Sequence, residues 1–378
     1  NNKMDSDNVT IIIDNGSSVI KAGNAGNLIP SNVFPSIVGH PHYPVLIQGV
    51  FSNDKYVGDV AIGYLAVSII NYPIKHGIVT NWDETKMLWH NIFFNELRVD
   101  PSEHPILITE HAKNPKSNRE KMMDIMFESF YIPSFYVSTK STLPTYAYNI
   151  HNCIVCHIGD GVTHISPIIN NTPLPKKGIR QNFGGHDLTD WLGELLNESG
   201  YAFTTTAEKE IVREIKEKHT YVALDYEKEL QKSKKTNECN FTYTLPDGND
   251  ITISDARFRC PELLFKPQMN GFQFDGIHMA IHNAIMECDD EVQNEMYQNI
   301  LLSGGCTMIN GFAERLEKEI KNLAPQKTKV KVIAEPERNL AAWKGGSAFA
   351  SLDKFPQMLI TSDEYVNDGP DIVHRKCF

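Results

Sequence analysis

The chain has 378 residues, and at about 150 residues per domain this length predicts two or three domains or two large lobes. Apolar residues make up 41% and charged residues 22%, which excludes a disordered chain, a collagen-like chain and a disulfide-stapled miniprotein. The net charge of −11 argues against a broad electrostatic hold on nucleic acid, so we expect no direct nucleic-acid partner.

Neither a membrane segment nor a secretory leader is expected. The most apolar run, residues 60–70, is far shorter than the roughly 18 residues that a spanning helix needs. Residues 1–5 lack the charged-then-apolar pattern of a leader. The seven cysteines are scattered, which is typical of reduced thiols. We therefore expect a cytoplasmic or cytoskeletal protein, with the nucleus as an open alternative.

The first strong signal along the chain is a buried strand at residues 9–13, which are β-branched or apolar. A polar turn with glycine follows at residues 14–18, and residues 19–23 can return beside the first strand as its partner. This segment therefore predicts a strand, a glycine turn and a second strand.

The same pattern recurs later in the chain. Residues 153–156 predict a strand, residues 157–161 a glycine turn and residues 162–166 a returning strand. Two such units about 140 residues apart indicate a duplicated architecture in which each unit opens one lobe.

Helices are expected after each of these units. Apolar spacing or capping residues predict them at residues 85–97, 117–130, 187–197 and 205–218. Gly200 can end the third, and Thr205 with Glu208 has the spacing of a capping box at the start of the fourth. Strands followed by helices, twice over, predict an α/β fold of two lobes.

Glycine turns after buried strands can present backbone N–H groups to phosphate. The turns at residues 15–18 and 159–161 both fit this description, and Lys21 follows the first turn at a distance that would let it reach a phosphate. A third turn, residues 302–306, follows another apolar strand. Each turn alone is a weak indication, but two on facing lobes could hold one polyphosphate.

A charged triplet offers two interpretations. Arg213, Lys216 and Glu217 have the spacing of one helix face. From the spacing alone, a solvated face with an ion pair is the simpler explanation, and a binding role is the alternative.

The pattern formed by Cys153, Cys156 and His157 matches a haem-attachment motif, but it lies inside an apolar strand. Residues i and i+3 of a strand point to opposite faces, so we expect no haem there. A second pair of Cys or His residues at zinc-ligand spacing is also lacking in the sequence.

Motifs along essentially the whole chain resemble those of the actin family. They are Asp14-Asn15-Gly16-Ser17, Lys21-Ala22-Gly23, residues 34–39, 72–74, 76–82, 118–122 and 159–164, Leu245-Pro246-Asp247-Gly248, Leu302-Ser303-Gly304-Gly305 and residues 374–378. The resemblance implies an actin-like ATPase fold, with duplicated ribonuclease-H-like lobes and four subdomains around a cleft for ATP or ADP and a divalent cation. The implied subdomains are residues 1–35, 73–147 and 341–378; residues 36–72; residues 148–183 and 273–340; and residues 184–272.

The resemblance also implies a set of site residues. Those that would contact the phosphates are Gly16, Ser17, Ser18, Lys21, Gly159, Asp160 and Gly161. Those that would border the nucleoside are Gly185, Arg213, Lys216, Glu217, Gly304, Gly305 and Cys306. Asp14 would belong to the metal site. For the charged triplet, the resemblance favours the binding role over the solvated face.

Three positions depart from the family pattern. Ser18 replaces a glycine, Lys140 replaces the glutamine that positions the attacking water, and His157 replaces the second metal-site aspartate. The last two changes add one positive charge and remove one negative charge, a sum of +2 that equals the charge of Mg²⁺. We therefore expect Mg²⁺ binding to be weakened or the ion to be replaced. Hydrolysis is expected to be slow or lost at an altered site that comprises Lys140, His157 and His164. A rearranged but working site is the alternative.

Two surfaces are expected to bind proteins. Residues 60–70 are apolar where the family is polar, and the preceding loop, residues 42–54, is changed almost throughout. This predicts a dedicated protein partner, unless the stretch packs internally. A regulator groove implied by the resemblance would include Tyr146, Phe349, Leu352 and Met358, with Lys354 at its edge.

The sequence therefore favours a divergent actin-like cytoskeletal protein that acts as a subunit of a filament or a defined complex. An ordinary polymerising actin with an active ATPase is the alternative. A sugar kinase or chaperone ATPase of the same superfamily is disfavoured. A kinase needs a sugar-site carboxylate and a chaperone needs a peptide-binding domain, and neither has a candidate in the sequence.

Overall fold

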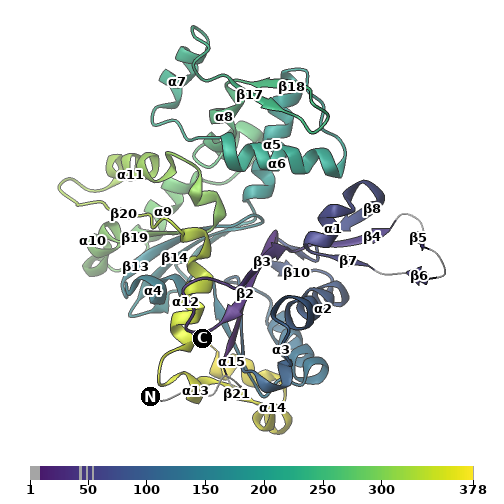
Figure 1. Ribbon diagram of the computed structural model, residues 1–378. Helices are drawn as coiled ribbons and strands as arrows, with labels where there is room; N and C mark the ends of the chain where they lie inside the picture. The colour runs from purple at the N-terminus through teal and green to yellow at the C-terminus, as the bar shows by residue number, and fades with distance from the viewer. Residues whose placement is uncertain (1–8, 42–44, 48–49, 53–54, 378) are drawn as a thin grey trace, which may run out of the picture. The chain divides into compact units, whose positions relative to one another are not determined.

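The computed structural model describes residues 9–41, 45–47, 50–52 and 55–377, which fall into two compact units (Figure 1). Unit 1 comprises Asn1–His151, Asn170–Pro175 and Leu340–Phe378, and unit 2 comprises Asn152–Ile169 and Lys176–Asn339. A division into four subdomains stays a prediction. The loop at residues 42–54, whose sequence differs from the family almost throughout, lies largely outside the described residues.

The main sheet of unit 1 has six strands in the spatial order β21, β12, β11, β1, β2, β3. Their bounds are β1 (Ile11–Asn15), β2 (Val19–Asn24), β3 (Asn32–Pro35), β11 (Ile106–Glu110), β12 (Ser134–Thr139) and β21 (Ile360–Thr361). β1 pairs antiparallel with β2 and parallel with β11. Every residue of β1 and β11 is buried, so these two strands form the centre of the core.

The remaining strands of unit 1 form small sheets. They are β4 (Val38–Pro41), β5 (Val45–Ile47), β6 (Val50–Ser52), β7 (Tyr56–Val57), β8 (Ser68–Asn71), β9 (Ile74–Lys75) and β10 (Ile78–Val79). β4 lies between β7 and β8, while β5 pairs with β6 and β9 with β10.

Helices cover the main sheet of unit 1, and Figure 1 shows α4 beside α12 although they are far apart in the sequence. The helices are α1 (Asp59–Gly63), η2 (Leu65–Val67), α2 (Trp82–His90), η3 (Asn91–Leu97), η4 (Pro101–Glu103), α3 (Lys116–Phe130), α4 (Leu143–Tyr148), α12 (Ala341–Ala350), α13 (Phe355–Met358), α14 (Ser362–Asp368), η8 (Pro370–Ile372) and α15 (Val373–Lys376). α12 packs on β1 and β11, so the C-terminal part of the chain completes the core begun by the N-terminal strands.

The main sheet of unit 2 repeats this topology. It contains β13 (Cys153–Ile158), β14 (Thr163–Ile169), β15 (Thr172–Pro173), β16 (Ile179–Gln181), β19 (Ile300–Ser303) and β20 (Val332–Ile333). β13 pairs antiparallel with β14 and parallel with β19, as β1 pairs with β2 and β11. The predicted duplication of a strand–glycine turn–strand unit is therefore present.

The other elements of unit 2 surround this sheet or form a separate hairpin. They are α5 (Gly185–Glu198), α6 (Thr206–His219), α7 (Tyr226–Ser233), β17 (Phe241–Thr244), β18 (Asp250–Ile253), α8 (Ala256–Glu262), η5 (Pro267–Asn270), α9 (Ile277–Met286), α10 (Asp290–Gln298), η6 (Gly305–Met308) and α11 (Phe312–Leu323). α9 packs on β14 and α10 on β13, while β17 pairs with β18. The chain passes back to unit 1 at η7 (Arg338–Leu340).

The predicted helix at residues 85–97 differs most from the structure. Its first part is α2, which begins three residues earlier because the side chain of Asn81 accepts a hydrogen bond from the Glu84 N–H. Its second part, η3, is a π-helix, and it ends at Arg98 in the left-handed conformation with φ 56°. The other predicted helices agree to within about two residues, and the capping box of Thr205 and Glu208 is confirmed.

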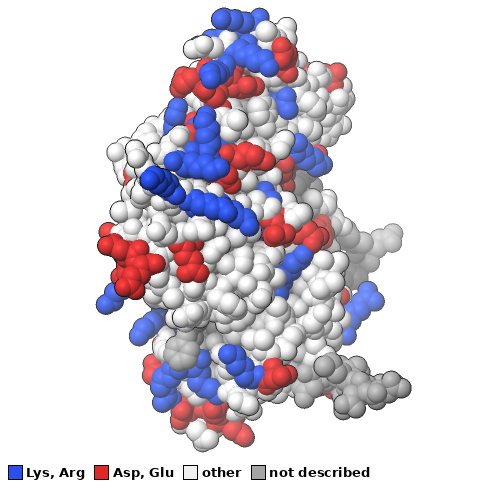
Figure 2. Space-filling view, turned by 90° about the vertical axis from the view of Figure 1, so that its left-hand side faces the viewer, with Lys and Arg blue, Asp and Glu red and all other residues white. Residues whose placement is uncertain are grey.

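The surface has a mixed charge distribution on the face drawn in Figure 2, where Lys and Arg side chains lie among Asp and Glu side chains. Ion pairs such as Lys177 with Asp289, at 2.9 Å, join opposite charges. Among the helices of the described residues, none has the length and apolarity that a membrane crossing requires. All seven cysteines lie in the described part of the chain, and each is a buried free thiol.

A close approach between helices gives the first prediction. A Cβ on Gly345 in α12 would lie 1.8 Å from the Leu143 carbonyl oxygen, whereas a Cβ on Gly193 in α5 would meet nothing within 4 Å. We expect Gly345→Ala to lower the melting temperature strongly, because α12 and α4 must separate. The matched control Gly193→Ala should be neutral or stabilising by up to about 1 kcal/mol. Differential scanning calorimetry measures both, and an unchanged melting temperature for Gly345→Ala would contradict the packing described.

Candidate functional site

The first glycine turn joins β1 to β2 in unit 1. A Cβ on Gly16 would lie 2.2 Å from the Val19 carbonyl oxygen, so only glycine fits. The Ser17 hydroxyl accepts a hydrogen bond from the Gly77 N–H at 2.9 Å, which fixes the side chain of this turn residue. Ser18 is not among the residues with positive φ, so the backbone does not require the glycine that the family has there.

A buried ion-pair network lies at the start of this turn. The Lys140 ammonium is 2.8 Å from Asp14 Oδ1, and the Lys21 ammonium is 2.8 Å from Asp14 Oδ2. The Thr109 hydroxyl also donates to Asp14 Oδ1, at 2.8 Å, and accepts a hydrogen bond from the Asn15 N–H. Both oxygens of the Asp14 carboxylate therefore have cationic partners.

The network is almost completely removed from water. The side chains of Lys140 and Asp14 are 5% and 3% exposed, and that of Lys21 is 15% exposed. Burial alone would raise the pKa of Asp14, but the charges and hydrogen bonds of Lys140 and Lys21 hold it well below its ordinary value. Burial lowers the pKa of Lys140, against the opposing effect of Asp14. Asp14 is therefore ionised at neutral pH.

The sheet explains why Lys140 reaches Asp14. β1, β11 and β12 are parallel neighbours, so their carboxyl ends meet at one edge of the sheet. Lys140 follows β12 directly, and its N–H donates to the Glu110 carbonyl at 2.8 Å. Thr109 lies at the end of β11 and Asp14 near the end of β1. Three strand ends thus converge on one carboxylate, as in other sites at the carboxyl edge of a sheet.

These residues do not fit the divalent cation that the resemblance implies. Mg²⁺ needs oxygen ligands in near-octahedral geometry, and both Asp14 oxygens already contact ammonium groups. His157 stands where the family has its second metal-site aspartate, and its imidazole offers nitrogen in place of oxygen. The donor set favours fixed positive charge over a bound hard cation.

The second glycine turn joins β13 to β14 in unit 2. The Gly159 N–H donates to the Val162 carbonyl at 3.0 Å and closes the turn. The Gly159 carbonyl accepts from the Gly185 N–H at 3.0 Å, and the Asp160 carbonyl accepts from the next N–H of α5 at 2.9 Å. A Cβ on Gly184 would lie 2.5 Å from the Asp160 carbonyl oxygen. The turn and the first residues of α5 are therefore held in close contact.

The third turn, between β19 and η6, packs against the second. Gly304 has φ +93°, and a Cβ there would lie 2.3 Å from the Ile158 carbonyl oxygen. The Cys306 thiol donates to the Gly159 carbonyl at 3.2 Å. Burial raises the pKa of Cys306 to about 12, so it is a protonated structural donor. A Cβ on Gly305 would meet nothing within 4 Å, so this glycine faces open space.

Lys216 and Arg213 of α6 have different surroundings. The Lys216 ammonium is buried and donates to the Gly185 carbonyl at 2.8 Å and to the Thr189 hydroxyl at 2.9 Å. Arg213 forms ion pairs with Glu210 and Glu217, both at 3.2 Å. The ion-paired face expected from the spacing is therefore present, while Lys216 contributes to the turn cluster.

The two expected histidines are neighbours in unit 2. His157 on β13 and His164 on β14 are cross-strand partners, and both are buried. The Nδ1 atom of His157 lies 3.0 Å from the Ser303 hydroxyl oxygen. Its Nε2 atom lies 3.4 Å from the position that a Cβ on Gly159 would take, so the ring borders the second turn.

Each unit thus gathers its own part of the predicted site. Unit 1 brings Asp14, Gly16, Ser17, Ser18, Lys21 and Lys140 to one turn and one sheet edge. Unit 2 brings Gly159, Asp160, Gly161, Gly185, Lys216, Gly304, Gly305 and Cys306 to adjoining turns, with Arg213 and Glu217 on the neighbouring α6. Sequence reasoning missed Thr109, Thr189 and Ser303. For Thr109, its place at the end of a buried strand was the available signal.

The apolar stretch at residues 60–70 is partly on the surface. Val60, Tyr64, Val67 and Ile69 are 57%, 44%, 52% and 55% exposed, whereas Ala61 is buried. The alternative that the stretch packs internally therefore holds for only part of it. The Tyr64 ring stacks on Tyr56, with ring centroids 4.2 Å apart.

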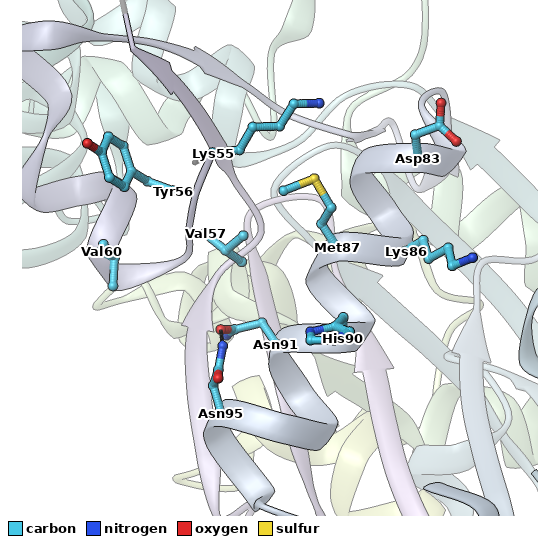
Figure 3. Close-up of a pocket in the computed structure, with 10 residues that line it drawn as sticks. All are labelled: Lys55, Tyr56, Val57, Val60, Asp83, Lys86, Met87, His90, Asn91 and Asn95. Carbon is cyan, nitrogen blue, oxygen red and sulfur yellow. Dashed lines mark hydrogen bonds between the residues drawn. The ribbon is translucent and has the colours of Figure 1, made fainter. Parts of the chain in front are cut away.

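A pocket of about 490 Å³ adjoins this stretch within unit 1. Figure 3 shows Val57 and Met87 near its centre, with Lys55, Lys86 and Asp83 around them. The other lining residues are Tyr56, Val60, His90, Asn91 and Asn95. Apolar contacts lie in the middle of the pocket and charged side chains border it, an arrangement suited to a protein segment.

The residues of the expected regulator groove lie at the edge of the unit 1 core. Phe349 is only 4% exposed, while Tyr146, Leu352 and Met358 are half-buried. The rings of Tyr146 and Phe349 have centroids 4.8 Å apart. Three of the four side chains are thus accessible in part, and Phe349 supports them from within.

Removing either charge of the Asp14–Lys140 pair should destabilise the protein, and the loss should be larger for Asp14 than for Lys140. Asp14→Asn leaves two ammonium groups without a counter-charge, and we expect a loss of about 3–5 kcal/mol. Lys140→Met leaves Asp14 with Lys21 and Thr109, so its loss should be smaller. Urea unfolding of both variants measures the difference.

The double variant is the control for this interaction. If the pair is coupled, combining the two substitutions should cost less than the sum of the single losses, by about 1–3 kcal/mol. Strict additivity would contradict a direct interaction.

The family model described as actin matches residues 5–378, which is nearly the whole chain. The duplicated strand–turn–strand units and the mixed α/β architecture agree with that family's fold. The chain therefore belongs to the actin family.

Proposed function

We propose that this protein binds ATP or ADP through its glycine turns and acts as a subunit of a filament or a defined complex, with slow or absent hydrolysis. Members of the actin family generally bind these nucleotides and interact with other protein subunits. The observation that carries the proposal is the ion pair between Lys140 and Asp14. A cytoskeletal or nuclear assembly is the setting that this function implies.

The charges of the first turn support phosphate binding. Lys21 and Lys140 contribute +2 and Asp14 contributes −1, so the network has a net charge of +1. The Ser17 hydroxyl, whose oxygen accepts from Gly77, can still donate its own proton. In unit 2, the turn at residues 159–161 needs glycine at neighbouring positions for its backbone to adopt this shape. Both turns are of the kind that holds anions.

The chemistry of Lys140 supports slow hydrolysis. A glutamine amide offers both a donor and an acceptor to a water molecule, whereas a lysine ammonium is a donor only. The Lys140 ammonium is also held by Asp14, so it is not free to move towards a water molecule. It can neither accept a proton from an attacking water nor orient that water through an acceptor atom.

A direct measurement tests both parts of this proposal. After incubation with ATP and removal of free nucleotide, the protein should retain about one nucleotide per chain on denaturation and chromatography. The retained nucleotide should stay ATP over hours, because water positioning is impaired. Rapid conversion to ADP at the rate of a polymerising actin would instead favour the ordinary ATPase, and protein without any nucleotide would contradict the proposal altogether.

The exposed part of residues 60–70 supports a dedicated protein partner. Val60 belongs to the apolar stretch and also lines the pocket, so the two features form one surface. Lys55 and Lys86 favour an acidic side chain on the partner, beside apolar ones that cover Val57 and Met87. The groove at Tyr146, Leu352 and Met358 is the second surface on which we place a regulator.

Site-specific crosslinking tests the partner surface. A photoreactive amino acid at Val67, which is 52% exposed, should yield one discrete crosslinked product in cells of the source organism. The matched control is Val366, which is 79% exposed and lies outside the proposed surface. The product at Val67 should disappear with Ile69→Asp while the melting temperature is unchanged. Crosslinks only to further copies of this chain would favour a self-polymerising actin.

A further inference from the structure

We infer that the Lys140 ammonium replaces the divalent cation in this protein, so that nucleotide is held without bound metal. This inference rests on the proposed nucleotide binding and adds the identity of the counter-charge. It starts from a single geometric fact, the direct contact of Lys140 with Asp14 at 2.8 Å.

The place of Lys140 is fixed by the backbone as well as by the ion pair. Its N–H is bound to the Glu110 carbonyl at 2.8 Å, and its side chain is 5% exposed. The ammonium therefore cannot move into solvent without leaving a buried, ionised Asp14 with one cationic partner fewer. It is a fixed partner of Asp14 at this sheet edge.

A divalent cation at Asp14 would have to displace these contacts. One oxygen receives Lys140 and Thr109, and the other receives Lys21. A cation inserted here would also lie within a few ångströms of two ammonium groups, and like charges at such distances repel strongly. The phosphates need positive charge, and Lys140 with Lys21 already supplies it.

A purely structural role for Lys140 makes a different prediction. If the ion pair only stabilises unit 1, substitution of Lys140 would lower stability and leave the metal requirement unchanged. If Lys140 is the counter-charge, its removal should create a metal requirement that the wild-type protein lacks. The two roles are thus separated by metal dependence and not by stability.

The experiment compares the full-length wild-type protein with Lys140→Gln, which restores the residue that the family resemblance implies. Each protein is loaded with a fluorescent ATP analogue, and the release rate is followed in Mg²⁺ and in EDTA. Wild type should release the analogue at rates that differ less than about twofold between the two conditions. Lys140→Gln should release it about tenfold faster or more in EDTA, because the charge is missing.

Metal binding gives a second readout that does not depend on release. Electron paramagnetic resonance of Mn²⁺ should detect about one bound ion per nucleotide-loaded Lys140→Gln chain and none for wild type. Lys121→Gln, on the exposed side of α3, removes a lysine elsewhere in unit 1 and should behave as wild type.

The outcomes separate this inference from the proposed function. The inference is overturned if wild type retains nucleotide only with Mg²⁺, or if nucleotide-loaded wild type binds Mn²⁺. Either result leaves the proposed nucleotide binding intact. Equal behaviour of Lys140→Gln and wild type also overturns it. Circular dichroism shows whether Lys140→Gln is folded; if it is not, the wild-type measurements decide alone. Proteins that bind no nucleotide in any condition overturn both the inference and the proposed function.

Discussion

The contact between Lys140 and Asp14 is the constraint on which the candidate site of unit 1 depends. It lies where the ends of three parallel strands meet, and it sets the charge beside the first glycine turn. A buried carboxylate needs compensation by charge and hydrogen bonds, and here the protein itself supplies both. The same arrangement that stabilises the sheet edge also places an ammonium group against each oxygen of Asp14.

The second unit uses backbone geometry for a similar purpose. Gly184, Gly185 and Gly304 allow three chain segments to approach more closely than side chains would permit. Cys306 and Lys216 then satisfy carbonyl groups of the turn and of α5. In unit 1 a buried ion-pair network adjoins the turn, whereas in unit 2 the Cys306 thiol and the Lys216 ammonium donate to backbone carbonyls. The duplicated topology thus supports two glycine turns with chemically different surroundings.

Much of the fold could be predicted from the sequence because periodicity and caps are local signals. The paired strands around both glycine turns followed from apolar runs, and Thr205 and Glu208 marked a helix start. The π-helical form of residues 91–97 could not be predicted, because its hydrogen bonds depend on how the segment packs. The predicted site residues converge within each unit, but Thr109 was missed because its role needs the register of β1 with β11.

Lys140 shows where residue identity is informative without geometry. Its charge is visible in the sequence, and the expectation that it compensates a metal, together with His157, rests on the resemblance to the actin family. Which atom it would contact was not visible, since Asp14 and Lys140 are distant in the chain and only the order of strands brings them together. Its direct pairing with Asp14, on the same oxygen as Thr109, comes from the fold.

The burial of every cysteine has a practical consequence for labelling. Burial raises the pKa of Cys153, Cys260, Cys306 and Cys377 to about 12. Thiols in this state are almost entirely protonated at neutral pH and react slowly with maleimides and oxidants. These four thiols should therefore contribute little background in thiol labelling. One cysteine placed at an exposed position such as Val366 would carry a fluorophore in preference to them.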